Sequence, residues 1–447
     1  MGLSVPRNAA AAMALRAGVS YISRSRDGVA HDHAARRLPL PPLERCVIGF
    51  VELARAAAAA RQARPAVPLA LATLVDVEGS SYRQPGARLL VDGEGRVLAG
   101  AVSGGCLEAD VALRAAEVCA TGRSVRLRYD LRADLQTIWG FGAACDGIAH
   151  LLLEPLPDWR WMVQAESVRA RRQGGAVVTV LPTAEASEGE EAGGTWMLLD
   201  GAPDSGHWHL LHSPATAVDE DRVRALTQVA FRTASAVYEP LSDQQAVFIE
   251  PLVAPVALHL VGGGRGAETF ARMASLLGWQ VTILEHRPAM LEALSTERPV
   301  HRRLVAADET PEQVLLSLPH DGRSAVALLS HIFDVDGAWL TAALPLPLGY
   351  IGVLGSRSRA AQLLERIEPA LEARGTPLTT KLRHKLHAPI GLDLGGESPA
   401  SIALSAIAEI EAVMHARPAG FLRDRVSPIH GRSPTPQPRP SSHAPEN

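Results

Sequence analysis

Cysteine is scarce in this sequence, and long apolar runs and an excess of either charge are absent. The four cysteines form no CxxC pair and no His/Cys cluster at zinc spacing, a pattern typical of a reducing, cytoplasmic compartment. No stretch approaches ~18 uninterrupted apolar residues, so we expect no membrane span. The net charge of −4, from 44 basic and 48 acidic residues, lacks the positive excess of nucleic-acid-binding proteins. We therefore expect neither a membrane nor a nucleic acid as partner.

The length of 447 residues allows two or three packed units without disulfides or metals. The expected fold class is α/β: an N-terminal α/β domain that carries an SGGC turn, joined to a C-terminal Rossmann-like domain with a parallel sheet. The expected regions are a disordered extension (1–40), the N-terminal cofactor-binding domain (41–157), a middle segment (158–250), the Rossmann-like domain (251–420) and a disordered tail (421–447). The extension superficially fits an organellar transit peptide, but disorder is favoured.

A glycine-rich turn follows an apolar strand at residues 257–261. Gly262 allows a tight turn, Gly264 lets the backbone approach a pyrophosphate, and the helix that follows offers free N–H groups to anionic oxygen. Glu285, 23 positions beyond Gly262, ends the next predicted strand, where a ribose hydroxyl would bind. These signals predict a Rossmann-like domain. Whether the turn holds a nicotinamide stays open, because Arg265 and Arg287 suggest a more anionic ligand than NAD.

Polar residues follow two further strands of this predicted sheet, over residues 325–329 and 349–354. Open parallel sheets bind ligands at the carboxyl ends of their strands. The candidate residues there are His331, Asp336, Gly355, Ser356 and Arg357. We expect His331 to bind a ligand or transfer a proton, or else only to cap a helix. The Gly-Ser-Arg triplet has the composition of a phosphate clamp.

The last helix of the domain has a clear start signal. Ser398 is a predicted N-cap, with Pro399 at the first helical position, and the predicted buried stripe is Ile402, Ala406, Ile410 and Val413. The preceding loop, residues 389–396, either faces a ligand or serves only packing.

The most specific chemical feature is a turn that we call the cysteine turn, residues 103–108 (Ser-Gly-Gly-Cys-Leu-Glu), between a strand and a helix. With Ser103, the amides of Gly104 and Gly105 form a predicted anion nest, and Cys106 lies at the positive end of the helix dipole, which favours a thiolate. A thiolate is a soft metal ligand or a sulfur carrier. Glu108 is either an acid or base, or a residue that stabilises the helix start. The remaining cysteines are expected only to pack: Cys46, Cys119 and Cys145.

A second turn, which we call the site loop, covers residues 79–86 and carries Ser80, Ser81 and Arg83. Because it joins two predicted strands of the same domain, it can cradle an anionic or hydrogen-bonding ligand next to the cysteine turn. The alternative is a merely solvated loop.

Over about residues 43 to 416 the chain resembles the xanthine dehydrogenase accessory proteins, a family that includes the related accessory factor of carbon monoxide dehydrogenase. The resemblance rests on ordered motifs: Leu71-Ala-Thr73, Gly79-Ser-Ser81, Pro85-Gly-Ala-Arg88, Ser103-Gly-Gly-Cys-Leu-Glu108, Phe248-Ile-Glu-Pro251, Tyr350-Ile-Gly352, Gly355-Ser-Arg357, His387-Ala-Pro-Ile-Gly-Leu-Asp393 and the helix from Ile402 to Ile410. It implies an N-terminal domain with the SGGC turn and a C-terminal Rossmann domain. It also implies binding of molybdenum cofactor, replacement of a terminal oxo by sulfido, and delivery to a molybdenum hydroxylase.

The resulting hypothesis is a molybdenum cofactor chaperone, more than an independent enzyme. Cys106 would contact the molybdenum or carry sulfur, with Ser81, Arg83 and the two glycine amides orienting the cofactor. His331, Arg357 and the Rossmann turn would bind its phosphate or a nucleotide. The implied partners are a cysteine desulfurase and a xanthine dehydrogenase-type hydroxylase, and a homo-oligomer is left open. The alternatives are an NAD(P)-dependent oxidoreductase, with His331 as proton donor oriented by Asp336, and a scaffold that binds no cofactor.

Overall fold

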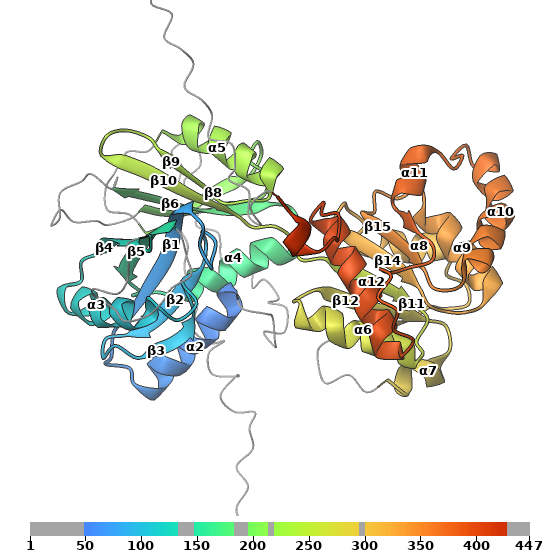
Figure 1. The fold of residues 1–447 in the computed structure, drawn as a ribbon, viewed down its shortest axis with the longest axis horizontal. Coiled ribbons are helices and arrows are strands. Elements are labelled where there is room, and N and C mark those ends of the chain that lie inside the picture. The colour runs from blue at the N-terminus through green and yellow to red at the C-terminus, as the bar shows by residue number, and fades with distance from the viewer. Residues whose placement is uncertain (1–48, 133–146, 183–194, 213–218, 295–299, 427–447) are drawn as a thin grey trace, which may run out of the picture.

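The fold is that of a computed structural model, which describes residues 49–132, 147–182, 195–212, 219–294 and 300–426. The predicted N-terminal extension, the tail beyond residue 426, Cys46 and Cys145 lie outside these ranges. The described residues form two lobes joined by a narrow waist (Figure 1). The N-terminal lobe holds two antiparallel sheets and the C-terminal lobe a parallel one.

The first sheet has the strand order β3-β2-β1-β5-β4. Its elements are α2 (Phe50–Ala63), β1 (Leu69–Gly79), β2 (Arg88–Asp92), β3 (Val97–Gly100), α3 (Glu108–Thr121), β4 (Val125–Asp130) and β5 (Gly147–Pro155). The strands β2 and β3 form a hairpin, and the Asp92 carboxylate accepts hydrogen bonds from the amides of Glu94 and Arg96 across its turn. Alternate residues of β1 enter different cores: Leu71 faces α2, and Ala72 faces α3. This strand is therefore buried on both faces.

The second sheet has the order β8-β7-β6-β10-β9. Its elements are α4 (Arg160–Ala170), β6 (Gly175–Pro182), β7 (Thr195–Asp200), β8 (His207–His212), α5 (Glu220–Thr233), β9 (Val237–Pro240) and β10 (Gln245–Pro251). One hydrophobic core joins both sheets, since Leu90 and Leu152 of the first share it with Val177 and Phe248 of the second. The middle segment thus packs against the N-terminal strands, and α3 and α5 cover the outer faces.

The C-terminal lobe is the predicted Rossmann-like unit. Its elements are β11 (Ala257–Val261), α6 (Arg265–Leu276), β12 (Gln280–Glu285), α7 (Pro288–Glu292), β13 (His301–Leu304), α8 (Pro311–Leu316), β14 (Ser324–Leu328), α9 (Phe333–Ala343), β15 (Tyr350–Val353), α10 (Arg357–Ala373), α11 (Thr380–His384), β16 (Leu386–His387) and α12 (Pro399–Met414). All strands pair in parallel in the order β13-β12-β11-β14-β15-β16, the order of a doubly wound dinucleotide-binding fold. The prediction is confirmed.

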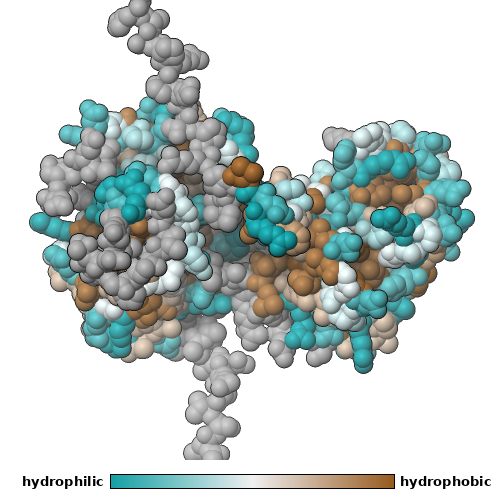
Figure 2. Space-filling view, in the orientation of Figure 1, coloured by the Kyte–Doolittle hydropathy of each residue, from teal (hydrophilic) through white to brown (hydrophobic). Residues whose placement is uncertain are grey.

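Helices cover both faces of this sheet. The helix α12 packs beside α6 on one face, with the predicted Ala406 and Ile410 buried and Ile402 and Val413 partly buried. Ser398 caps α12 as predicted, since its hydroxyl accepts from the Ser401 amide. Figure 2 shows hydrophobic side chains gathered on the surface over α6 and α12. Among the described residues no helix is long and apolar enough to span a membrane.

Two arginines tie the lobes together at the waist. Arg172, in the loop after α4, has an ion pair of 2.6 Å with Asp321 and donates to the carbonyl of Pro255 at 2.5 Å. Arg323 Nε donates to the carbonyl of Ala254 at 2.7 Å. These bonds satisfy backbone carbonyls of the segment that crosses between the lobes.

Candidate functional site

The site loop and the cysteine turn lie side by side in the N-terminal lobe. The Tyr82 ring lies against Gly104, where an added Cβ would be 3.5 Å from the ring. Arg83 Nε donates to the carbonyl of Ala101 at 3.3 Å, just before the turn. The strands β1, β2 and β3 are neighbours in the sheet, so the segments that leave their ends meet at one edge. Two candidate segments from the sequence thus form one surface.

Glu108 organises the cysteine turn from within. Its carboxylate accepts from the amides of Val102 (3.1 Å), Ser103 (2.8 Å) and Leu107 (3.2 Å) and from the Ser103 hydroxyl. Burial alone would raise the pKa of Glu108, but these hydrogen bonds outweigh it and lower the pKa. The structure gives Glu108 the contacts of the second predicted role, a charged acceptor that stabilises the helix start.

The turn leaves one thiol and one glycine amide for a ligand. Cys106 is a free, partly buried cysteine that packs against the α3 core, and Gly104 and Gly105 are exposed. Gly105 has φ +110°, which favours glycine there. Its amide donates to the Ser103 hydroxyl at 3.1 Å, so of the two glycine amides of the predicted nest only that of Gly104 has no partner among the described residues.

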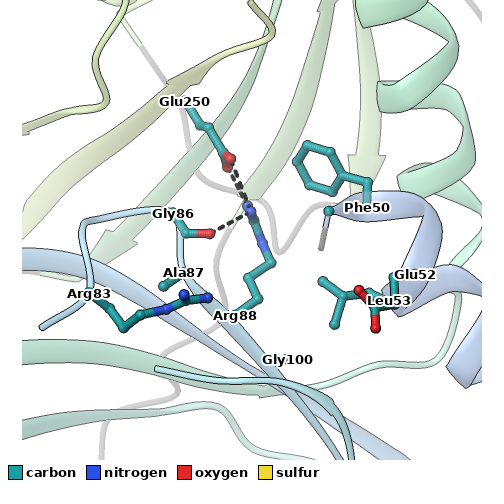
Figure 3. Close-up of a pocket in the computed structure, with 10 residues that line it drawn as sticks. Phe50, Glu52, Leu53, Arg83, Gly86, Ala87, Arg88, Gly100 and Glu250 are labelled. Carbon is teal, nitrogen blue, oxygen red and sulfur yellow. Dashed lines mark hydrogen bonds and ion pairs between the residues drawn. The ribbon is translucent and has the colours of Figure 1, made fainter. Parts of the chain in front are cut away.

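The site loop contributes polar groups to the same surface. Ser80 is exposed and Ser81 partly buried, and neither hydroxyl bonds to another described residue. A pocket of about 140 Å³ opens beside the loop, and Figure 3 shows Arg83 and Arg88 lining it with Phe50 and Glu250.

The donor set of this surface suits a molybdenum cofactor. Cys106 offers one soft sulfur ligand, and Arg83, Ser80 and Ser81 offer hydrogen bonds to phosphate or pterin. In the part of the chain that the structure describes, no three His, Cys, Asp or Glu side chains converge on a metal position.

At the carboxyl edge of the parallel sheet the predicted residues also assemble. Gly262 has φ +111°, and an added Cβ would lie 2.9 Å from the backbone of Ser330. The glycine turn therefore lies directly beside the end of β14. The residues brought to this edge by the ends of β11, β12, β14 and β15 are Gly262, Gly264, Arg265, Glu285, Arg287, His331, Gly355, Ser356 and Arg357.

Glu285, predicted as the ribose acceptor, is already paired. Its buried carboxylate accepts from the amide of Gly263 at 2.7 Å and from the guanidinium of Arg287 at 2.8 Å. Burial opposes ionisation, yet these hydrogen bonds hold the pKa of Glu285 at about 2. Both residues stay candidate ligands, but Arg287 is paired with Glu285, and a ribose hydroxyl would compete with that internal ion pair.

Asp336 does not orient His331, contrary to the oxidoreductase hypothesis. It is fully buried and accepts from the Ser330 hydroxyl at 2.5 Å and from Arg359 at 2.6 Å. His331 is exposed, with φ +60°, and its ring has no hydrogen-bond partner among the described residues. The buried position of Asp336, on the first turn of α9, directs its carboxylate into the fold, so the predicted proton-transfer pair does not form.

The predicted phosphate clamp is partly used by its own helix. The Ser356 hydroxyl caps α10 by accepting from the Arg359 amide at 3.2 Å. Arg357 and Arg265 are exposed at the starts of α10 and α6. These two guanidinium groups remain as candidate phosphate ligands.

The loop 389–396 is tied to α12, which supports its packing role. Glu409 on α12 accepts from the Gly391 amide at 2.7 Å and from the Tyr350 hydroxyl, and its carboxylate lies 3.0 Å from His387 Nδ1.

Sequence reasoning missed Tyr82, Arg88 and Glu250 as neighbours of the site in the N-terminal lobe. The last two stand in motifs of the family resemblance, the only signal that marked them.

Comparison with known proteins identifies the family of the chain. The XdhC Rossmann domain matches residues 258–410, and the XdhC and CoxI family matches residues 54–130. A probable xanthine dehydrogenase subunit from Bacillus subtilis is 30% identical over 344 residues, covering 76% of this chain and 91% of that protein. The molybdenum cofactor insertion chaperone PaoD of Escherichia coli is 44% identical over 59 residues, 13% of this chain and 18% of PaoD.

A crystal structure of a xanthine dehydrogenase from Bacillus halodurans has the same fold, with a TM-score of 0.61, 23% identity, and coverage of 83% of this chain and 97% of that one. The match over nearly the whole Bacillus subtilis relative includes both lobes, and the two family matches fall on the two lobes separately. The chain therefore belongs to the XdhC and CoxI family, the xanthine dehydrogenase accessory proteins.

Proposed function

We propose that this protein binds molybdenum cofactor, protects it, supports its sulfuration and inserts it into a xanthine dehydrogenase-type hydroxylase. The observation that carries the proposal is the surface where the partly buried Cys106 lies beside the exposed Gly104 and the polar site loop. The relation to a protein named as a molybdenum cofactor insertion chaperone supports the same cargo.

Each residue of this surface has a separate part. Glu108 and Ser103 fix the backbone of the cysteine turn, so that Cys106 presents its sulfur at a constant place. Arg83 and Ser81 bind anionic or polar groups of the cargo, which supplies the soft metal. Cys106 contacts that metal or carries sulfur that a cysteine desulfurase provides.

The carboxyl edge of the Rossmann-like sheet has a supporting role in this proposal. Arg265, Arg357 and His331 are the exposed groups there, and they bind the cofactor phosphate, its nucleotide portion or a separate nucleotide. The acidic residues of the edge take no part, because arginines already neutralise them.

The experiment is Cys106→Ser, which keeps a hydrogen-bonding group and removes the soft sulfur. A cofactor-free molybdenum hydroxylase is reconstituted with the purified accessory protein, cofactor and a sulfur source, and activity is divided by molybdenum incorporated. We expect a loss of roughly tenfold or more in this ratio, the scale of a lost metal or nucleophile contact.

The matched control is Cys119→Ser on α3. Cys119 is half-buried, and burial raises the pKa of its thiol, so it should remain protonated and only pack. We expect normal transfer from this variant. Normal activity per molybdenum from Cys106→Ser would refute the role of the cysteine turn and move the site to the Rossmann-like lobe.

A further inference from the structure

Two sequence motifs without an assigned role meet inside the N-terminal lobe. Arg88 begins β2 and Glu250 lies near the end of β10, 162 positions away. The guanidinium donates to both carboxylate oxygens, at 2.6 Å and 3.2 Å. The Arg88 side chain is only 5% exposed and that of Glu250 is 20% exposed, so water screens the pair weakly. This forked pair links the first sheet to the second.

Aromatic side chains hold the guanidinium in place. The Arg88 Cζ atom lies 4.7 Å from the ring centre of Phe50 on α2 and 5.9 Å from that of Trp161 on α4. These distances are those of cation–π contacts. Neither ring offers an oxygen acceptor, so the direction of the fork depends on its hydrogen bonds to Glu250 and to the Gly86 carbonyl.

The same ion pair touches the site loop at Gly86. Arg88 also donates to the carbonyl of Gly86 at 3.1 Å, and an added Cβ on Gly86 would lie 3.2 Å from Glu250. Gly86 has φ +97°, so the chain turns sharply there. Figure 3 shows Glu250 reaching Arg88 from the second sheet with Gly86 beside it. The last residue of the site loop is therefore held between both members of the pair.

We propose that Glu250 is a positioning residue: through Arg88 it fixes the site loop, and so holds Tyr82 over the cysteine turn. The second sheet, through Glu250, would then set the geometry of a surface that is built on the first sheet. The positioning itself is independent of the cargo, and only its consequence for cofactor binding rests on the proposed function.

The test is Glu250→Gln in the full chain, which keeps the shape of the side chain and removes its charge. We expect amide hydrogen exchange over residues 80–87 to accelerate about tenfold, because the loop opens more often. Alkylation of Cys106 by iodoacetamide, followed by peptide mass spectrometry, should accelerate as Tyr82 leaves the turn. Neither measurement uses cofactor.

The matched control is Asp92→Asn, at the opposite end of β2. Asp92 is also buried and paired, with Arg64 at 2.6 Å and Arg96 at 2.9 Å, but it does not touch the site loop. We expect this variant to lower the unfolding free energy while exchange at 80–87 and alkylation of Cys106 stay at wild-type rates.

Wild-type rates at both places in a folded Glu250→Gln variant, or equal acceleration by Asp92→Asn, would overturn the proposal. If Glu250→Gln does not fold, Arg88→Lys replaces it, since a lysine keeps the charge but lacks the planar fork that pairs with both carboxylate oxygens. Here too, wild-type rates overturn the proposal. Wild-type protein that binds no molybdenum cofactor would refute the proposed function and leave the positioning result intact.

Discussion

The cysteine turn and the carboxyl edge of the Rossmann-like sheet share one arrangement, a glutamate hydrogen-bonded to backbone amides, but they differ in which charged groups stay available. At each place a partly or fully buried glutamate accepts backbone amides: Glu108 in the turn and Glu285 at the edge. Glu285 also binds Arg287, whereas the hydrogen bonds of Glu108 come from the turn itself. The turn thus leaves its thiol and the neighbouring Arg83 for a ligand, while the edge cancels much of its own charge. The comparison gives a rule: a charged residue at a strand end is available to a ligand when it has no internal ion-pair partner.

The largest effect expected from this comparison is for Glu285→Ala. The variant leaves the Gly263 amide and the Arg287 guanidinium without their buried partner, so we expect a loss of about 3 kcal/mol in unfolding free energy. Urea unfolding measures it. A loss below about 0.5 kcal/mol together with failure to bind a nucleotide would make Glu285 a ligand and break the comparison.

Glu108→Gln tests the other side of the comparison. A glutamine amide cannot replace both acceptor oxygens, so we expect a loss of about 2 kcal/mol at neutral pH. Because the pKa of Glu108 is lowered in the folded state, its contribution is present above the unfolded value of 4.5 and is lost as pH falls through the folded pKa. Urea unfolding at neutral and acidic pH should show the two proteins converge in acid. A difference that is independent of pH would contradict this account.

A third buried glutamate extends the comparison of Glu108 and Glu285. It accepts a single hydrogen bond, which is too few to keep its carboxylate ionised. Glu154 accepts from Trp196 Nε1 at 2.7 Å, and burial raises its pKa to about 8 despite that bond and the nearby Arg88. The stability that the protonated form provides is full below pH 4.5 and is lost as pH rises through 8. We expect Glu154→Gln to equal wild type in acid and to become progressively more stable than wild type as pH rises from 4.5 to above 8. Thermal unfolding across this range measures it, and a fixed offset would refute the raised pKa.

The smallest effect on stability is expected for Arg357→Ala. This side chain is exposed at the start of α10, so the unfolding free energy should change by less than about 0.5 kcal/mol. Binding of a phosphorylated ligand such as AMP, measured by calorimetry, should weaken by about 1.5 to 3 kcal/mol, the scale of a charge-assisted hydrogen bond. Unchanged affinity would mean that Arg357 binds no phosphate, although it is exposed at the edge of the sheet.

The sequence predicted the Rossmann-like lobe in more detail than the N-terminal one. Its strands and helices alternate along the chain, so each strand–turn–helix unit is a local pattern around residues such as Gly262 and Ser398. The strands β4, β5, β9 and β10 were not predicted. In the N-terminal lobe β1 pairs with β5, about 80 residues away, and such long-range antiparallel pairing leaves no periodic signal between the partners.

By itself the sequence determined the family, the parallel character of the last sheet and the residues that gather at its edge and at the cysteine turn. Only the tertiary structure decided which charged residues are paired: Glu285 is bound to Arg287, and Asp336 to Arg359. It also revealed a pair that the sequence did not predict, Arg88 with Glu250 across two sheets. The reason is physical. Turns and caps depend on backbone conformation within a few residues, whereas an ion pair depends on which distant side chains share one desolvated space.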